Sequence, residues 1–198
     1  TEEDAHNLIN DYSYAANNSD KFNLNGVDVE IIDNNNDGDA EYVLFTRETL
    51  SEVRTYSEKN ETISFYAPGY DKNNELANKT VTETEDFEDV VFNDEVTTDD
   101  LILYVQYGGR TYLEKPEVVT GEMEHFNVKG TEKYMTVGGE KYKADELETN
   151  ARTEVVKFDV TECDKANGVQ FETSYNFYLD DYGNVIAFEE VEAAAKNY

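Results

Sequence analysis

Apolar and polar residues alternate along much of this chain with the two-residue period of a strand that buries one face. Val27, Val29 and Ile31, for example, alternate with Asp28 and Glu30, and such alternation predicts a half-buried β-strand. Similar segments and short apolar runs predict further strands at 42–45, 63–65, 101–105, 118–126, 134–144, 155–160, 169–178 and 185–191. The chain is therefore expected to be mainly β.

Residues 1–16 follow the period of a helix instead. Their apolar positions have the three- and four-residue spacing of an amphipathic helix, and they are Ala5, Leu8, Ile9, Tyr12 and Ala15. Thr1 and Asp4 are placed as in a helix-capping box, and the polar residues 17–20 would end the helix. We expect a short N-terminal helix ahead of the strands.

The predicted strands fall on either side of a polar, acidic stretch at 71–100. This stretch is expected to be a long loop or a junction between modules. Gly-centred hairpins recur roughly 70 residues apart, which is typical of successive small β modules, although any all-β chain produces hairpins at such spacing. We expect two small tandem barrel- or sandwich-like β modules, residues 1–97 (with the N-terminal helix and an acidic hairpin loop) and residues 98–198.

The charge of the chain narrows the classes of partner. Its 45 acidic residues stand against 16 basic ones, for a net charge of −29. Such a surface repels phosphate backbones and anionic membrane surfaces but attracts divalent cations. We expect no nucleic-acid partner, and the absence of an apolar run long enough to span a bilayer predicts no membrane insertion. Because the chain begins at Thr1 without a Met, we expect a piece of a longer protein.

Thirteen per cent of the residues are aromatic, with 15 Tyr, 10 Phe and no Trp. Aromatic side chains bury large areas, so they can compensate for scarce aliphatic residues in a core. A disordered chain is therefore not expected, despite the charge. The single cysteine, Cys163, excludes an intrachain disulfide.

The segment 33–41 is the strongest candidate for a metal site. Oxygen-bearing side chains stand at the alternating positions Asp33, Asn35 and Asp37, and Gly38 follows. Hard cations such as Ca²⁺ prefer several oxygen ligands from a flexible loop. An EF-hand is excluded, because its twelfth position would need a bidentate Glu and Leu44 stands there.

The spacing resembles the Asp-x-Asx-x-Asp-Gly-x-x-acid hairpin loops of integrin-type propeller repeats, which hold Ca²⁺ between two strands. The resemblance implies that Asp33, Asn35 and Asp37 donate side-chain oxygens, that Asp39 offers its carbonyl, and that Glu41 closes the site, where the family usually has Asp. The alternative is a plain hairpin turn built from Asn, Asp and Gly, which are good turn formers.

Other chemistry has little support in the sequence. His6, His125 and Cys163 do not have the spacing of a zinc site. The sequence contains no nucleophile elbow, Walker loop or dinucleotide-binding glycine motif. Pairs of carboxylates, as in glycoside hydrolases, occur in nearly every window of so acidic a chain and therefore carry no information.

Exposed tyrosines could form a sugar-binding platform, and the candidates are Tyr66, Tyr70, Tyr104, Tyr107 and Tyr112. The alternative is that tyrosines on strands simply cover the sheet with their hydroxyls toward water.

Three phrases of the sequence resemble the repeated β modules of Gram-positive cell-surface proteins that carry S-layer homology repeats. They are residues 29–45, residues 100–112 together with 119–121, and residues 178–186. The resemblance implies an extracellular, cell-wall-associated location and a spacer, lattice or adhesive role. Neighbouring modules of the same longer chain would then be the partners.

We therefore expect a non-catalytic structural or spacer module of an S-layer-like protein, made rigid by Ca²⁺ at the acidic hairpin loop. Two alternatives stay open. One is an adhesin or glycan-binding module that uses exposed tyrosines to bind cell-wall or host glycans. The other is a wall-directed hydrolase whose catalytic acids are hidden among the many carboxylates.

Overall fold

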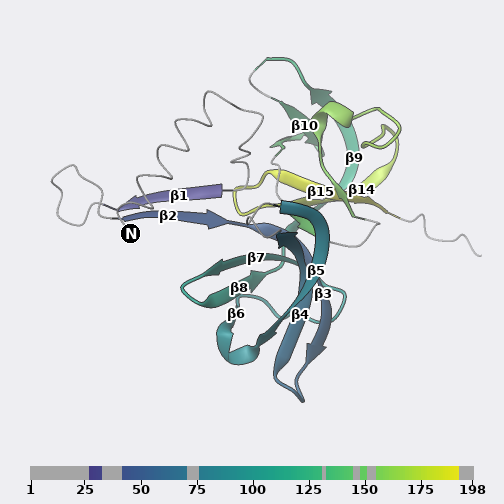
Figure 1. The fold of residues 1–198 in the computed structure, drawn as a ribbon. Coiled ribbons are helices and arrows are strands. Elements are labelled where there is room, and N and C mark those ends of the chain that lie inside the picture. Colours follow the sequence, from purple (N-terminus) through teal and green to yellow (C-terminus); the bar gives the residue numbers. More distant parts are fainter. Residues whose placement is uncertain are drawn as a thin grey trace, which may run out of the picture. The chain divides into compact units, whose positions relative to one another are not determined.

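A computed structural model gives the fold (Figure 1). It describes residues 27–32, 42–70, 76–130, 133–144, 148–150 and 155–191. The prediction of a mainly β chain is confirmed, because the described residues form fifteen strands and two single-turn 3-10 helices. The predicted N-terminal helix lies outside the described residues. Contacts divide the chain into two units, residues 1–47 and 48–198.

The described part of the first unit is one hairpin. β1 (Val27–Ile32) pairs with β2 (Tyr42–Arg47) in antiparallel register, and Ile32 lies opposite Tyr42. The two strands therefore flank the acidic segment 33–41, as the sequence predicts.

The second unit contains two sheets, of which we name the first the β3 sheet. Its strands, in hydrogen-bonded order, are β5 (Leu76–Asp86), β4 (Thr62–Tyr70), β3 (Thr49–Ser57), β7 (Leu101–Tyr107), β8 (Arg110–Glu114) and β6 (Val90–Phe92). A further short strand, β12 (Glu148–Asn150), pairs with β3 in parallel.

The β3 sheet is strongly curled. The side-chain amide of Gln106, on β7, donates hydrogen bonds to Glu83 (3.1 Å) and Glu85 (3.4 Å) of β5. In a flat sheet β5 and β7 would be about 14 Å apart, because neighbouring strands are separated by about 4.8 Å. The curl encloses a hydrophobic core in which the rings of Phe65 and Tyr104 lie 4.8 Å apart.

The prediction of a long loop at 71–100 is wrong for residues 76–92, which form regular elements. β5 occupies 76–86, the 3-10 helix η1 (Phe87–Asp89) follows, and β6 begins at Val90. β5 forms because its backbone pairs with β4 along most of its length, while the side chains of residues 81–86 alternate between half-buried and exposed positions. A strand at the edge of a sheet needs no continuous apolar face. The boundary predicted at 97/98 lies in the loop between β6 and β7, and the division into modules 1–97 and 98–198 stays a prediction.

We name the other sheet the β9 sheet. Its strands, in hydrogen-bonded order, are β11 (Glu140–Lys143), β10 (Tyr134–Val137), β9 (Glu117–Asn127), β14 (Ser174–Leu179), β15 (Val185–Glu190) and β13 (Val156–Lys157). The prediction of strands at 118–126 and 134–144 is confirmed. The predicted strand at 169–178 begins only at Ser174, because the preceding residues belong to the connection that covers the sheet.

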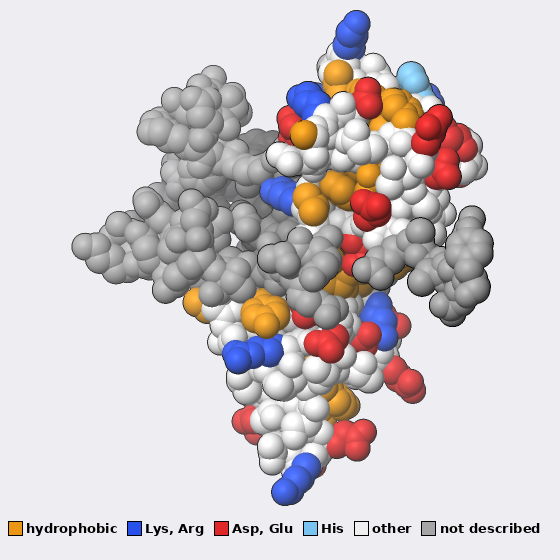
Figure 2. Space-filling view, turned by 90° about the vertical axis from the view of Figure 1, so that its right-hand side faces the viewer, with side chains coloured by type: hydrophobic (Ala, Val, Ile, Leu, Met, Phe, Trp, Pro, Cys, Tyr) orange, Lys and Arg blue, Asp and Glu red, His pale blue; other side chains and the backbone are white. Residues whose placement is uncertain are grey.

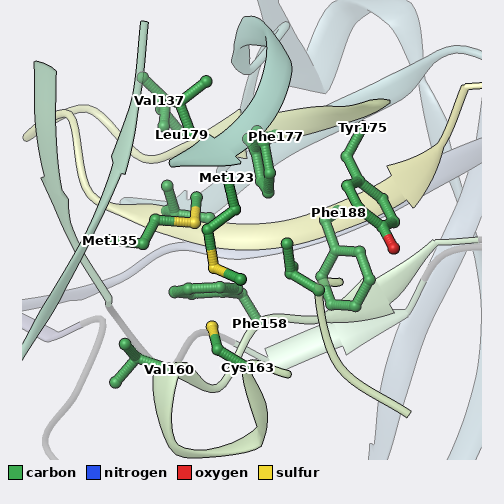
Figure 3. Packing of buried hydrophobic residues seen from close by; sticks show 12 residues of the cluster. Met123, Met135, Val137, Phe158, Val160, Cys163, Tyr175, Phe177, Leu179 and Phe188 are labelled. Carbon is green, nitrogen blue, oxygen red and sulfur yellow. The ribbon is translucent and has the colours of Figure 1, made fainter. Parts of the chain in front are cut away.

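That connection, between β13 and β14, includes the 3-10 helix η2 (Val160–Glu162). It places Phe158, Val160 and Cys163 in the same buried cluster as side chains of the sheet. Figure 3 shows the ring of Phe158 between Met123 of β9 and Cys163. Burial raises the pKa of the Cys163 thiol to about 12, so this cysteine is a packing residue and not a thiolate at neutral pH.

Within this connection, the backbone at Gly168 approaches the backbone of Glu162 so closely that only glycine fits. A Cβ atom at this position would overlap the backbone carbonyl of Glu162. We therefore expect Gly168→Ala to lower the free energy of unfolding by on the order of 1–3 kcal/mol, as overpacking does. Urea unfolding followed by circular dichroism measures the effect. The exposed neighbour Asn167 provides the control, and equal stabilities of Gly168→Ala and Asn167→Ala would contradict the close approach.

The two sheets pack against each other inside the second unit. Leu50 of β3 and Leu103 of β7 share a buried cluster with Tyr178 of β14 and with Ile186 and Ala187 of β15. This cluster is separate from the cores of the individual sheets. It therefore fixes one sheet on the other, and the candidate site described next includes residues from both.

Candidate metal site

The ligands predicted from the sequence fall outside what the structure describes. They are Asp33, Asn35, Asp37, Asp39 and Glu41, all within the segment between β1 and β2. The flanking hairpin agrees with the prediction, and the ligand set itself stays a prediction.

The described residues contain a different group of carboxylates, which we name the carboxylate cluster. It consists of Glu48, Glu114 and Asp181; one carboxylate oxygen of each residue lies within 4.8 Å of the other two. Glu48 immediately precedes β3, Glu114 is the last residue of β8, and Asp181 lies in the turn between β14 and β15. The cluster could hold a metal ion.

A tight turn presents Asp181. The neighbouring carboxylate of Asp180 is buried and accepts hydrogen bonds from the backbone N–H groups of Tyr182 (3.0 Å) and Asn184 (2.7 Å). Its other oxygen accepts from the Asn184 side chain at 3.0 Å. Gly183 has a φ of +75°, a left-handed conformation that glycine adopts without strain. The hydrogen bonds of Asp180 therefore stabilise the turn that places Asp181 in the carboxylate cluster.

One basic side chain adjacent to the cluster in sequence, that of Lys115, is engaged elsewhere. Lys115 directly follows Glu114, but its ammonium group pairs with Asp100 at 2.9 Å. The cluster also accepts hydrogen bonds from uncharged donors. The side-chain amide of Asn93 donates to Glu114 at 3.4 Å, and the backbone N–H of Asp181 donates to Glu48.

The crowding of like charges shifts the acidities in the cluster. Burial, followed by the charges of Asp181, Asp180 and Glu114, raises the pKa of Glu48 to about 8, against the opposing effect of the Asp181 N–H. Burial and the neighbouring Asp181 carboxyl group also raise the pKa of Glu114. In a metal-free chain, Glu48 is therefore protonated at neutral pH.

A divalent cation relieves the same crowding as a proton does. Three carboxylates offer about three to six oxygens, and Ca²⁺ takes about six to eight, with water completing the shell. Because the ligands must be deprotonated, metal and protons would compete for the cluster. The arrangement can thus exchange protons for one hard cation.

Of the remaining sequence candidates, those whose side chains the structure describes lie outside this cluster. His125 lies exposed on β9, where its ring is 6.0 Å from that of Tyr134. Of the candidate platform tyrosines, Tyr104 is buried in the core of the β3 sheet, and Tyr66 and Tyr112 are half-buried. The side chains of Tyr70 and Tyr107 and the whole of His6 lie outside the described part. The glycan-binding alternative stays a prediction.

Sequence reasoning missed the carboxylate cluster because its members belong to three distant segments. Glu48 and Glu114 are 66 positions apart (114 − 48), and Glu114 and Asp181 are 67 apart (181 − 114). A short-range motif cannot contain such a group. The signal that was available is Asp181 itself, which lies in the Asp-Asp-Tyr-Gly-Asn turn of a predicted hairpin.

No protein-family model matches the sequence, and no curated protein resembles it closely enough to count as a relative. Within the described ranges, none of the helices has the length and apolarity that crossing a bilayer requires.

Proposed function

We propose that this chain is a non-catalytic structural module of an extracellular, S-layer-like cell-wall protein, and that Ca²⁺ makes it rigid. The proposal keeps the role and location that the sequence resemblance implies. It adds the carboxylate cluster as a second site for the cation, in addition to the predicted site in the acidic hairpin loop. The curled β3 sheet and the covered β9 sheet would be the two barrel- or sandwich-like bodies of such a module.

One observation carries the proposal: the carboxylate cluster contains residues of both sheets. Glu48 and Glu114 come from the β3 sheet and its entry, whereas Asp181 comes from a turn of the β9 sheet. The buried inter-sheet cluster also uses β3, β14 and β15, the strands next to Glu48 and Asp181. A cation held by all three carboxylates would therefore fasten one sheet to the other.

The charge of the molecule supports a cation-dependent spacer. Figure 2 shows Asp and Glu side chains scattered over the face in view, among fewer Lys and Arg. A net charge of −29 concentrates divalent cations near the surface and opposes compaction through self-repulsion. Bound Ca²⁺ would offset this repulsion where the two sheets meet.

The test is thermal unfolding of the chain in excess chelator and in millimolar Ca²⁺. A ligand at 100 times its Kd stabilises the folded state by about 2.7 kcal/mol, which corresponds to roughly 5–10 °C in Tm for a chain of this size. We expect Ca²⁺ to raise the Tm of the wild-type chain by this amount. Glu114→Gln, which removes one carboxylate at nearly constant shape, should lose most of the increase.

Two further variants separate the possible sites. Asp37→Asn removes a predicted ligand of the hairpin loop, and Glu122→Gln removes an exposed charge on β9 as a control for general screening. If only Asp37→Asn loses the Ca²⁺ effect, the cation binds at the hairpin loop and not at the cluster. If all four proteins show an equal increase in Tm, the Ca²⁺ effect is non-specific screening, and the cluster is not a metal site.

A further inference from the structure

A groove of about 620 Å³ opens between the end of β3 and the loop that follows β6. We name it the aromatic groove. Its lining consists of Tyr56, Glu58, Phe92 and the consecutive residues 93–97. The volume is in the range of small-ligand sites, and none of these residues belongs to the carboxylate cluster.

Aromatic rings form one wall of the groove. The rings of Tyr56 and Phe92 meet edge to face with centroids 6.2 Å apart. Phe87, from η1, supports both rings at 5.1 Å from Tyr56 and 5.3 Å from Phe92. Such mutually packed rings hold a fixed position, and the side chains of Tyr56 and Phe92 remain half-exposed to the groove.

The rest of the lining is largely the loop of residues 93–97, which is held by hydrogen bonds. The backbone N–H of Asn93 donates to the Leu113 carbonyl at 2.8 Å, and that of Thr97 donates to the Asp100 carboxylate at 2.7 Å. The Asp94 carboxylate accepts from the backbone N–H of Lys115 at 2.8 Å. The groove is therefore formed before any ligand arrives, which lowers the entropic cost of binding.

The charged side chains that line the aromatic groove are all acidic. Glu58, Asp94 and Glu95 are exposed at its rim, and its lining residues include no Lys, Arg or His. The segment 81–100, which supplies the loop, contains no basic residue. Its nine acids are Glu83, Glu85, Asp86, Glu88, Asp89, Asp94, Glu95, Asp99 and Asp100. Carboxylates beside aromatic faces attract an organic cation through charge and through the quadrupole of the rings.

We propose that the aromatic groove binds a lysine-bearing segment of a partner protein. The ammonium group would lie between the rim carboxylates and the ring faces of Tyr56 and Phe92, and the methylene stem would pack on the same rings. Charge complementarity favours this occupant over a neutral sugar, whose hydroxyls can hydrogen-bond to the three carboxylates but gain no attraction between opposite charges. The site adds a partner contact to the module and does not depend on Ca²⁺.

Binding can be measured by NMR on the full chain, with an acetylated, amidated tetralysine peptide as the probe. We expect saturable shifts that are largest at the backbone amides of residues 93–97. The same peptide with acetylated side-chain amines keeps its length and loses its charge, so it should not shift the signals of these amides. Phe92→Leu, which keeps an apolar side chain, should weaken binding about two- to fivefold, the amount expected for one exposed cation–π contact.

Charge variants distinguish the groove from general attraction to an acidic protein. Glu58→Gln combined with Glu95→Gln should weaken peptide binding at least about fivefold. Glu117→Gln combined with Glu122→Gln removes the same charge from exposed positions on β9 and should change it less than about twofold. Equal weakening in the two double variants, or shifts spread evenly over the surface, would overturn the proposal. If the signals of residues 93–97 shift with protein concentration in the absence of peptide, the groove binds a second copy of the chain, and this result would also overturn the proposal.

Discussion

At pH 8.5 and above, in the absence of divalent cations, Glu48→Gln will unfold at higher urea concentration than the wild-type chain. Glu48 has an ordinary pKa of 4.5 in the unfolded chain and a pKa of about 8 in the folded one. A shift of this size corresponds to about 5 kcal/mol, and solvent screening of a partly accessible group lowers the expected gain to roughly 2–4 kcal/mol.

The direction of the pH effect follows from the raised pKa. Below about pH 4.5 Glu48 is protonated in both states and contributes no difference. Between about pH 4.5 and 8 only the unfolded chain releases the proton, so the free energy of unfolding falls as the pH rises. Above about pH 8 the folded chain carries the full charge repulsion with Asp181, Asp180 and Glu114. Glutamine has no proton to release, so the variant should lose this slope.

Urea titrations followed by circular dichroism at pH 5.5, 7 and 8.5 measure the slope. Glu122→Gln, an exposed substitution with the same loss of charge, should follow the wild-type curve. If the free energy of unfolding depends on pH in the same way for the wild type and Glu48→Gln, charge repulsion at Glu48 does not destabilise the folded chain. Ca²⁺ should stabilise the wild-type chain more at pH 8.5 than at pH 5.5, because protons compete for the same oxygens.

Local patterns in the sequence predicted much of the strand content because each strand with one buried face carries its own signal. β9 alternates around the buried Met123, and the Gly138-Gly139 turn joins β10 to β11. β5 lacked that signal. Its residues Thr82 to Glu85 are all polar, and its strand conformation comes from pairing with β4 and from the contacts that Gln106 makes across the curled sheet. These are tertiary effects that local propensity does not contain.

The candidate site was less accessible to prediction than the fold. In a chain with 45 acids, the probability that some carboxylates meet is high, and no spacing rule indicates which ones. Glu48, Glu114 and Asp181 meet because the β3 sheet places the start of β3 near the end of β8 and because the β14–β15 turn reaches them. Only the order of strands in the two sheets provides this information. The ligands predicted in segment 33–41 stand within nine consecutive residues, so the sequence alone is enough to suggest them.

Ile186→Ala is expected to uncouple the two sheets. Ile186 is completely buried in the inter-sheet cluster with Leu50 and Leu103, and its backbone carbonyl accepts a hydrogen bond from Phe158 at 2.9 Å. Truncation of a buried isoleucine to alanine costs about 2–5 kcal/mol. Because the lost contacts lie between the sheets, the cost should fall on their association more than on either individual core.

We therefore expect the wild-type second unit to unfold in one transition and Ile186→Ala to unfold in two. Hydrogen exchange resolved along the chain can assign each transition to the β3 sheet or the β9 sheet. Val156→Ala, at an exposed position of β13, should leave one transition. If a cation at the carboxylate cluster fastens the sheets, millimolar Ca²⁺ should bring the two transitions of Ile186→Ala back together, and should fail to do so in the double variant that also carries Glu114→Gln. A single transition in Ile186→Ala, lowered equally for both sheets, would mean that the sheets share one cooperative core and need no cation to join them.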